Sequence, residues 1–237
     1  MTARRLPPQP GEWIDRARSF DFEFEGTRVT AQVGDTVTSA VLATGRTVLG
    51  RSFKYHRPRG VLSAANHDAN VLVDDDEHIN IRADVTAPVP GARYRVVNTR
   101  GGVDGDRGRF IEWLAPWLPV GFYYKAFHKP RALFPYWERL IRQMSGLGEV
   151  TPRHTAERGT TRRLHCDVLI VGAGAAGLAA ARTLATAGLS VLVVDENAQP
   201  GGTLGYDHDA DGAAQGWLRE TLAALTNGGV TLMTSTC

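Results

Sequence analysis

Hydrophobic and polar residues alternate strictly in the first part of the chain. The phenylalanines of residues 20–24 alternate with acidic residues, and this period of two predicts a half-buried β-strand. A Glu-Gly turn follows, and residues 28–33 alternate again, so the two segments predict a hairpin. Residues 37–44 then carry apolar side chains at helical spacing, directly after Thr36, which is suited to cap a helix.

Two short apolar segments, 70–73 and 79–83, predict further strands on either side of an acidic turn. The order strand, strand, helix, strand, strand predicts a small β-grasp domain at residues 20–83. The Pro- and Arg-rich residues 1–19 are expected to form an extended N-terminal extension. Residues 84–163 are less periodic, and their one clear helical pattern is at 136–144.

The segment 84–163 is rich in Trp, Tyr and Phe, which flexible linkers avoid. We therefore expect this connecting segment to pack over a neighbouring domain or a partner subunit.

From residue 164 the pattern becomes that of a parallel strand–helix–strand unit. Apolar runs at 168–171 and 191–194 flank an alanine-rich segment with helical character. A further helix at 215–225 and a strand at 230–234 are predicted. A doubly wound sheet normally has more strands than these, so residues 164–237 are expected to form the first, incomplete part of a Rossmann-like dinucleotide-binding domain. The fold class predicted for the chain is α/β (α+β).

The composition is that of an ordinary soluble globular protein, with 43% hydrophobic and 22% charged residues. A net charge of +2 gives no reason to expect nucleic acid or an anionic membrane as a partner. No stretch approaches the ~20 apolar residues of a spanning helix, and the N-terminus has no secretory signal pattern. Cys166 and Cys237 are too few for a disulfide framework or a Cys-based metal site, and they fit a reducing cytoplasm.

The most informative residues follow the first apolar run of the second domain. Gly172, Gly174 and Gly177 have the G-x-G-x-x-G spacing of a loop that binds the pyrophosphate of a dinucleotide. The first glycine allows a tight turn, the second lets the backbone approach the phosphates, and the third lets the helix lie close to the strand. The N–H groups of Ala175 and Ala176 then start the helix that faces the anion. A purely structural strand–helix–strand unit is the alternative.

An acidic residue ends the second apolar run. Asp195, with Glu196 beside it, follows the first glycine by about 20 residues, where a carboxylate accepts hydrogen bonds from the adenosine ribose. A carboxylate there repels a 2′-phosphate, and no Arg follows to receive one, so NADP is disfavoured. NAD and FAD share the same ADP half, and the motif does not separate them. Gly202 belongs to a second glycine pair of the kind found in flavoproteins with two dinucleotide sites.

Two further segments resemble those of a known protein family. Residues 50–60, GRSFKYHRPRG, and 121–125, GFYYK, resemble the α subunit of heterotetrameric sarcosine oxidase, as do the glycine motif and the Asp-Glu-Asn…Gly-Gly segment. The resemblance covers nearly the whole chain in the same order. It implies an N-terminal portion of a longer subunit that continues into the rest of the dinucleotide fold and a folate-binding domain.

The resemblance also bears on metal cofactors. Related domains in opine oxidase and hydrogen cyanide synthase subunits hold a [2Fe–2S] cluster through cysteines. The corresponding positions in this chain are Ser63, Asp68 and Val71. The first domain is therefore expected to be a ferredoxin-like domain without its iron–sulfur cluster.

The resemblance implies a reaction and partners. Enzymes of this family oxidise sarcosine to glycine, with formaldehyde or 5,10-methylenetetrahydrofolate and hydrogen peroxide as the other products. An α subunit of this kind binds NAD and assembles with β, γ and δ subunits, with FAD in the β subunit and FMN at the α/β boundary. It implies no catalytic residue in this chain, which alone would be inactive. The alternative is a free-standing FAD- or NAD-dependent oxidoreductase related to opine or proline dehydrogenases or hydrogen cyanide synthase subunits.

Other candidate residues have two interpretations each. The basic cluster at 51–59 contacts an FMN phosphate or a partner subunit, or else it is a charged loop whose aromatic residues pack locally. Cys166 is a reactive thiol near the nucleotide or a small apolar residue. His208, between two aspartates, suggests a metal ligand or a solvated loop.

Overall fold

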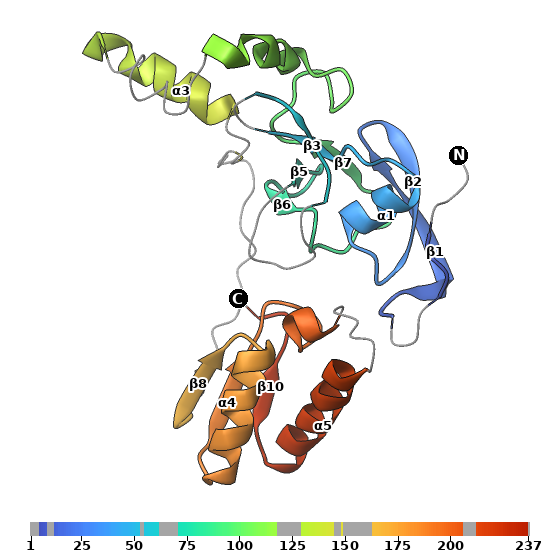
Figure 1. The fold of residues 1–237 in the computed structure, drawn as a ribbon, viewed down its shortest axis with the longest axis vertical. Helices are drawn as coiled ribbons and strands as arrows, with labels where there is room; N and C mark the ends of the chain where they lie inside the picture. The colour runs from blue at the N-terminus through green and yellow to red at the C-terminus, as the bar shows by residue number, and fades with distance from the viewer. Residues whose placement is uncertain are drawn as a thin grey trace. The chain divides into compact units, whose positions relative to one another are not determined.

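The computed structural model describes residues 5–8, 12–52, 55–61, 71–117, 129–144, 148, 163–205 and 212–236. The chain divides into two compact units, residues 1–156 (unit 1) and 157–237 (unit 2), and each has its own hydrophobic core (Figure 1). The two units are described in turn.

Unit 1 contains a five-stranded sheet in the order β2-β1-β7-β5-β6. The β1–β2 and β5–β6 pairs are antiparallel hairpins, and the last strand lies between them, parallel to β1 and antiparallel to β5. This strand order confirms the predicted β-grasp fold. The strands are β1 (Asp15–Phe24), β2 (Thr27–Val33), β5 (Leu72–Asp74), β6 (Ile81–Arg82) and β7 (Arg93–Val96).

The first hairpin has one buried face, as its alternating pattern predicts. Phe22 and Phe24 of β1 and Val29 and Ala31 of β2 are all buried in the core of unit 1. The strands join at Glu25 and Gly26, which both have positive φ, 51° and 75°. Such a turn matches the twist of the two strands and fixes which face of the hairpin is buried.

Helix α1 (Val37–Ala43) packs Val37, Ala40 and Val41 into the same core. Thr36 caps the helix, and its side-chain oxygen and that of Ser39 accept hydrogen bonds from each other's backbone N–H groups in a capping box. Asp35, 2% exposed, accepts hydrogen bonds from Ser39 Oγ (2.8 Å) and from Gln32 N (2.7 Å). It also pairs with the guanidinium of Arg5, which ties the N-terminal extension to unit 1.

Strand β7 lies outside the segment 20–83 from which the sheet was predicted, so the sheet is larger than expected. The strand is only four residues long, and its alternation of Arg, Tyr, Arg and Val is too short to register as a pattern. Tyr94 is 1% exposed and contacts Phe22 edge-on, with ring centroids 5.5 Å apart. β1 also starts earlier than predicted, at Asp15.

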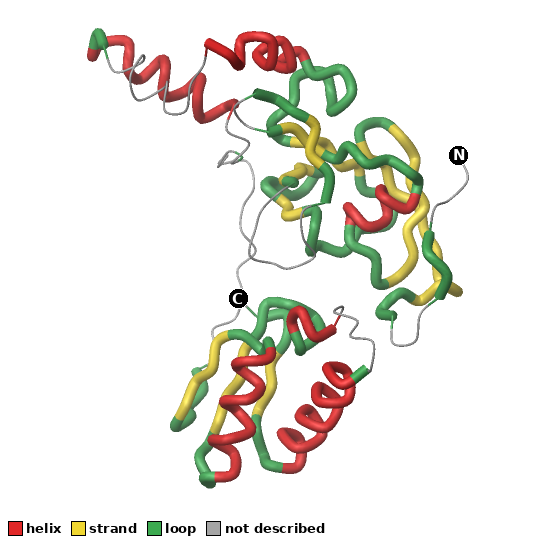
Figure 2. The backbone as a smooth tube through the Cα atoms, viewed as in Figure 1, coloured by secondary structure: helices red, strands yellow, loops and turns green. Residues whose placement is uncertain are grey.

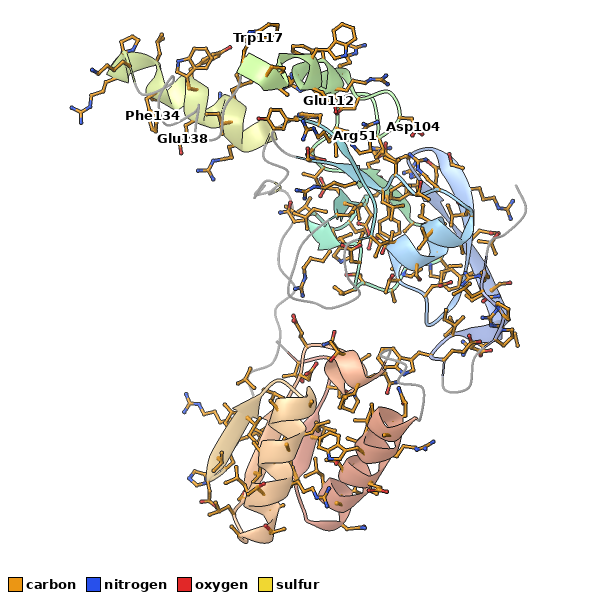
Figure 3. All side chains as sticks on the ribbon, viewed as in Figure 1. Arg51, Asp104, Glu112, Trp117, Phe134 and Glu138 are labelled. Carbon is orange, nitrogen blue, oxygen red and sulfur yellow. The ribbon has the colours of Figure 1, made fainter. Side chains whose placement is uncertain are left out.

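After β7, the aromatic-rich segment contains three described helices. It contains the 3₁₀ helices η1 (Arg107–Trp117) and η2 (Arg131–Leu133), and α3 (Phe134–Met144), which confirms the predicted helix at 136–144. Figure 3 marks Trp117 on η1 and Phe134 on α3, and both side chains are exposed in this structure, by 76% and 50%. The GFYYK segment at 121–125 lies outside the described residues.

Unit 2 is a parallel three-stranded sheet in the order β10-β9-β8, with two helices that pack on it and on each other (Figure 2). The strands β8 and β9 have the predicted bounds. The opposite face of the sheet carries Leu169 and Val171, which are exposed by 55% and 81%. The elements are β8 (Val168–Val171), α4 (Ala175–Thr186), β9 (Val191–Val194), η3 (Gly202–Gly205), α5 (Ala213–Asn227) and β10 (Thr231–Met233).

No helix in the described part of the chain is long and apolar enough to cross a membrane.

Candidate dinucleotide site

The glycine motif forms the turn between β8 and α4. Gly172 has φ +100°, a conformation that residues with a Cβ rarely adopt, and its N–H donates to Val194 O at 2.7 Å. The loop therefore begins at the ends of β8 and β9, at the edge where parallel α/β sheets bind their ligands.

The other two glycines have different surroundings. A Cβ on Gly177 would lie 1.9 Å from Gly172 O and 3.3 Å from Ile170 Cγ2, so this position must be glycine for α4 to lie against β8. A Cβ on Gly174 would have nothing within 4 Å. The backbone at Gly174 is therefore open to an approaching group, whereas Gly177 is closed by packing.

The N-terminus of α4 is suited to an anion. Gly174 is its N-cap and supplies no side chain, and the first turn, which starts at Ala175 and Ala176, contains no acidic residue. The first N–H groups of an α-helix have no acceptor within the helix, and the helix dipole adds partial positive charge there. Backbone N–H groups of this kind bind phosphates.

Asp195 is brought directly beside this loop. It follows the last residue of β9 and is 8% exposed. Its Oδ2 accepts the N–H of Ala173 at 2.5 Å, and its Oδ1 accepts the backbone N–H of Asn197 at 2.8 Å and the Asn197 amide at 2.9 Å. The predicted acid and the predicted glycine loop are thus one connected unit, while Glu196 is exposed.

The second glycine pair packs on the first motif. Gly201 N donates to Ala173 O at 2.8 Å, and Gly201 forms a parallel bridge with Gly174. Both glycines of the pair have positive φ, 121° for Gly201 and 54° for Gly202. A Cβ on Gly202 would lie 3.2 Å from Gly174 Cα, so the chain here approaches the open backbone closely. Gly202 was predicted for the site, and Gly201 joins it.

Two parts of the site were missed by sequence reasoning. Asn197 was not singled out, although an Asp-x-Asn sequence after a strand is typical of a side-chain-capped turn. The segment after β10 also contributes, because Ser235 N donates to Asn197 O at 2.9 Å and Thr236 N to Asp195 O at 2.8 Å. No local signal at these residues pointed to the site, since only the parallel pairing of β10 with β9 brings them there.

The basic cluster at 51–59 lies on a two-stranded hairpin, β3 (Gly50–Arg51) with β4 (Pro58–Arg59). Arg51 Nε donates to Val103 O at 2.8 Å, and Arg57 Nε lies 3.4 Å from Glu112 Oε1 (Figure 3). These local partners favour the interpretation as a charged loop. Phe53 and Lys54 lie outside the described residues.

His56 and Asp106 form a buried pair within this region. His56 Nδ1 lies 2.5 Å from Asp106 Oδ2, and the residues are 4% and 0% exposed. Asp106 Oδ1 also accepts the N–H groups of Arg100 and Gly108, both at 3.1 Å. The pair therefore joins the hairpin to the start of η1.

The candidate metal ligands are only partly within the described chain. Val71 is 2% exposed and lies in the core of unit 1, whereas Ser63, Asp68 and His208 lie outside the described residues. Among the residues that the structure describes, no group of three or more His, Cys, Asp or Glu side chains is placed to hold a metal ion. Cys166 is a half-buried free thiol.

Comparison with known families matches both units. Residues 17–99 match a 2Fe-2S iron-sulfur cluster binding domain, and residues 170–224 match an NAD(P)-binding Rossmann-like domain. An iron–sulfur cluster of this type needs cysteine thiolates. Residues 17–99 contain no cysteine, so the residues present do not fit the cluster after which the first family is described.

A solved structure with a similar fold is the crystal structure of L-proline dehydrogenase from P. horikoshii. The TM-score is 0.52 at 16% sequence identity, over 93% of this chain and 34% of that chain. At this identity the likeness concerns the fold alone. It agrees with a ferredoxin-like unit followed by a Rossmann-like unit.

Among curated proteins, the chain is 39% identical over 231 residues to sarcosine oxidase subunit alpha of Rhizobium meliloti (strain 1021). It is 30% identical over 236 residues to the subunit of the same name from Corynebacterium sp. (strain P-1). These alignments cover 93% and 94% of this chain but 23% and 20% of the relatives, so the chain spans less than a quarter of their length. The resemblance inferred from residues 50–60 and the glycine motif is thereby confirmed: over nearly its whole length, this chain is similar to part of a sarcosine oxidase α subunit.

Proposed function

We propose that unit 2 binds the ADP half of a dinucleotide, and that this dinucleotide is NAD. The observation that carries the proposal is the contact between Asp195 and the glycine loop, where the carboxylate accepts the Ala173 N–H beside the open backbone of Gly174. The same contact places an acidic side chain beside the glycine loop, at the end of the second strand, where dinucleotide-binding folds carry the acid that binds the ribose.

Different residues are expected to bind different parts of the ligand. The pyrophosphate is expected over Gly174, where it receives the N–H groups of Ala175 and Ala176 at the start of α4. The adenosine ribose is expected at Asp195, which accepts hydrogen bonds from its hydroxyl groups. Gly202, held close to Gly174, leaves room for the same ligand.

The acid also favours one nucleotide over another. Residues 195–205 contain no Lys or Arg, so a 2′-phosphate would meet a carboxylate and no countercharge from this segment. NADP is therefore disfavoured. FAD carries the same ADP half as NAD and remains the alternative ligand at this site.

The similarity to sarcosine oxidase α subunits extends the proposal to the whole enzyme. We propose that the chain acts in a cytoplasmic oxidoreductase that oxidatively demethylates sarcosine to glycine, together with β, γ and δ subunits and with FMN at a subunit boundary. In this scheme the chain binds a cofactor and contributes no catalytic acid, base or nucleophile. A free-standing FAD- or NAD-dependent oxidoreductase is the alternative, and sarcosine-dependent oxygen uptake by the purified chain alone would favour it.

Calorimetric titration of the purified chain with NAD, NADP and FAD tests the ligand. In a chain that extends through the rest of the dinucleotide fold, we expect NAD to bind, and Asp195→Ala to weaken it about tenfold to a hundredfold, because hydrogen bonds to a charged group contribute roughly 1.5–3 kcal/mol. The ligand-free unfolding midpoint of the variant serves as the folding control. Equal NAD affinity in a folded Asp195→Ala variant would contradict the proposed site, and tighter FAD binding would replace NAD with FAD.

A further inference from the structure

We infer that Asn197 is a positioning residue for Asp195 and thereby a determinant of selectivity for an unphosphorylated ribose. This inference rests on the proposed function, because it concerns how the nucleotide site discriminates between ligands. The observations behind it are the hydrogen bonds that hold the Asp195 carboxylate.

Asn197 holds one carboxylate oxygen of Asp195 twice. Its backbone N–H and its side-chain amide donate to Oδ1 at 2.8 and 2.9 Å. The other oxygen, Oδ2, accepts Ala173 N–H at 2.5 Å. With both oxygens bonded, rotation of the Asp195 side chain breaks at least one hydrogen bond to a charged acceptor.

The turn that carries Asn197 is itself fixed by the third strand. Asn197 O accepts Ser235 N–H at 2.9 Å, and Asp195 O accepts Thr236 N–H at 2.8 Å. Asp195 N donates in turn to Met233 O at 2.9 Å. Backbone hydrogen bonds to β10 and the residues after it therefore fix the turn that contains Asn197, and Asn197 in turn fixes the orientation of the Asp195 carboxylate.

This arrangement leaves room for a hydroxyl but not for a phosphate. An ionised carboxylate has about four acceptor positions, and three N–H groups already occupy positions on Asp195. A ribose hydroxyl can donate to what remains. A 2′-phosphate needs donors or cations, and Asp195 cannot turn away to reduce the repulsion while Asn197 holds it.

Substitution of Asn197 should therefore change the affinities for NAD and for NADP in different ways. Asn197→Ala removes the amide donor but keeps the backbone N–H, so the carboxylate gains freedom to rotate. For NAD, the acceptor of its ribose hydrogen bonds is then less well oriented. For NADP, the repulsion between the carboxylate and the 2′-phosphate is weaker. The ratio of the NAD and NADP affinities therefore falls, whereas general destabilisation of the site would weaken both nucleotides equally.

The test is titration of the full chain with NAD and with NADP. We expect Asn197→Ala to weaken NAD about five- to tenfold, with NADP affinity unchanged or improved, so that the selectivity ratio falls by at least the same factor. Asn197→Asp, which sets a second carboxylate against Asp195, should weaken NAD further. Asn197→Ser, which retains a short donor, should recover part of the NAD affinity. Gln199→Ala, which removes an exposed amide two residues away, is the matched control and should change nothing.

The outcomes separate this inference from the proposed function. If the unaltered chain binds neither nucleotide, the proposed function fails and the inference fails with it. If it binds NAD and Asn197→Ala behaves like Gln199→Ala, the inference alone is wrong. Equal loss of NAD and NADP affinity in Asn197→Ala would show a general structural role and would also overturn it.

Discussion

At the scale of single residues, two glycines of one motif have opposite requirements. Gly177 is enclosed, since an added Cβ would meet Gly172 O at 1.9 Å, while Gly174 faces open space. One is therefore needed for packing of α4 on β8, and the other leaves the backbone open at the site proposed for the pyrophosphate.

This difference predicts that substitution of Gly177 affects mainly stability, whereas substitution of Gly174 affects mainly nucleotide binding. Gly177→Ala should lower the free energy of unfolding of unit 2 by about 1–3 kcal/mol, because the backbone carbonyl must move to accept the methyl group. Gly174→Ala should cost less than about 1 kcal/mol, the loss of a favourable N-cap, but should weaken nucleotide binding. Urea unfolding and calorimetric titration measure the two effects. A Gly174→Ala variant that binds NAD unchanged would contradict the assignment of the open backbone to the pyrophosphate.

At the scale of elements, buried polar groups hold unit 1 together at the ends of its helix and strands. Asp35 joins the turn after β2, the start of α1 and the N-terminal extension, and its partner Arg5 has a side chain that is 17% exposed. Tyr94 of β7 receives the Val89 N–H at 3.0 Å and packs on Phe22 of β1.

Arg5→Ala should lower the free energy of unfolding of unit 1 by about 3 kcal/mol, because it leaves the buried carboxylate of Asp35 without its countercharge. Arg28→Ala is the matched control, since Arg28 pairs with Asp21 at the surface with an 80% exposed side chain, and should produce no measurable change. Denaturant unfolding followed by circular dichroism compares the two. Equal stability of Arg5→Ala and the unaltered chain would mean that residues 5–8 add nothing to unit 1.

Tyr94 predicts a loss of stability in alkaline solution. Burial raises the pKa of the Tyr94 phenol above its usual value, so the folded state favours the neutral form. The resulting stabilisation is complete below the unfolded pKa of about 10 and is lost as the pH rises through the higher folded pKa. The unfolding free energy of unit 1 should therefore fall above about pH 10, and Tyr94→Phe should flatten this dependence. An unchanged slope in Tyr94→Phe would assign the effect to other groups.

At the scale of the whole molecule, the two units have separate hydrophobic cores, so we expect each unit to respond separately to core substitutions and to ligand. The core of unit 1 includes Phe24 and Val41, and that of unit 2 includes Leu178 and Leu218. Each cluster consists of residues from its own unit, so a substitution in one core removes contacts within that core.

Leu178→Ala should lower the unfolding free energy of unit 2 by about 2–5 kcal/mol and leave the transition of unit 1 in place. Phe24→Ala should do the reverse. Saturating NAD should raise only the transition of unit 2, because a ligand stabilises the part that it binds. Calorimetric unfolding of the three samples is the measurement. A single transition that moves as one in every case would show that the two units unfold cooperatively.

Much of the fold and the site was readable from local pattern. The period of two in 20–24 and 28–33 required a hairpin with one buried face, and the apolar runs 168–171 and 191–194 became β8 and β9 with the same bounds. The glycine spacing indicated the loop. These features are local because they depend on side-chain periodicity and on backbone conformations that only glycine adopts readily.

What the tertiary structure alone decided involves residues far apart in the chain. β7 joins β1 and β5 although its four residues carry no readable period, and Arg5 reaches Asp35. At the site, the backbone of Ser235 and Thr236 fixes the turn that contains Asn197, and Asn197 fixes Asp195. Hydrogen bonds between separate strands leave little trace in local composition, because every residue except proline supplies the backbone N–H and C=O groups that make them. The sequence alone therefore determined which residues form the candidate site, and the packing of β8, β9 and β10 decided how they are held.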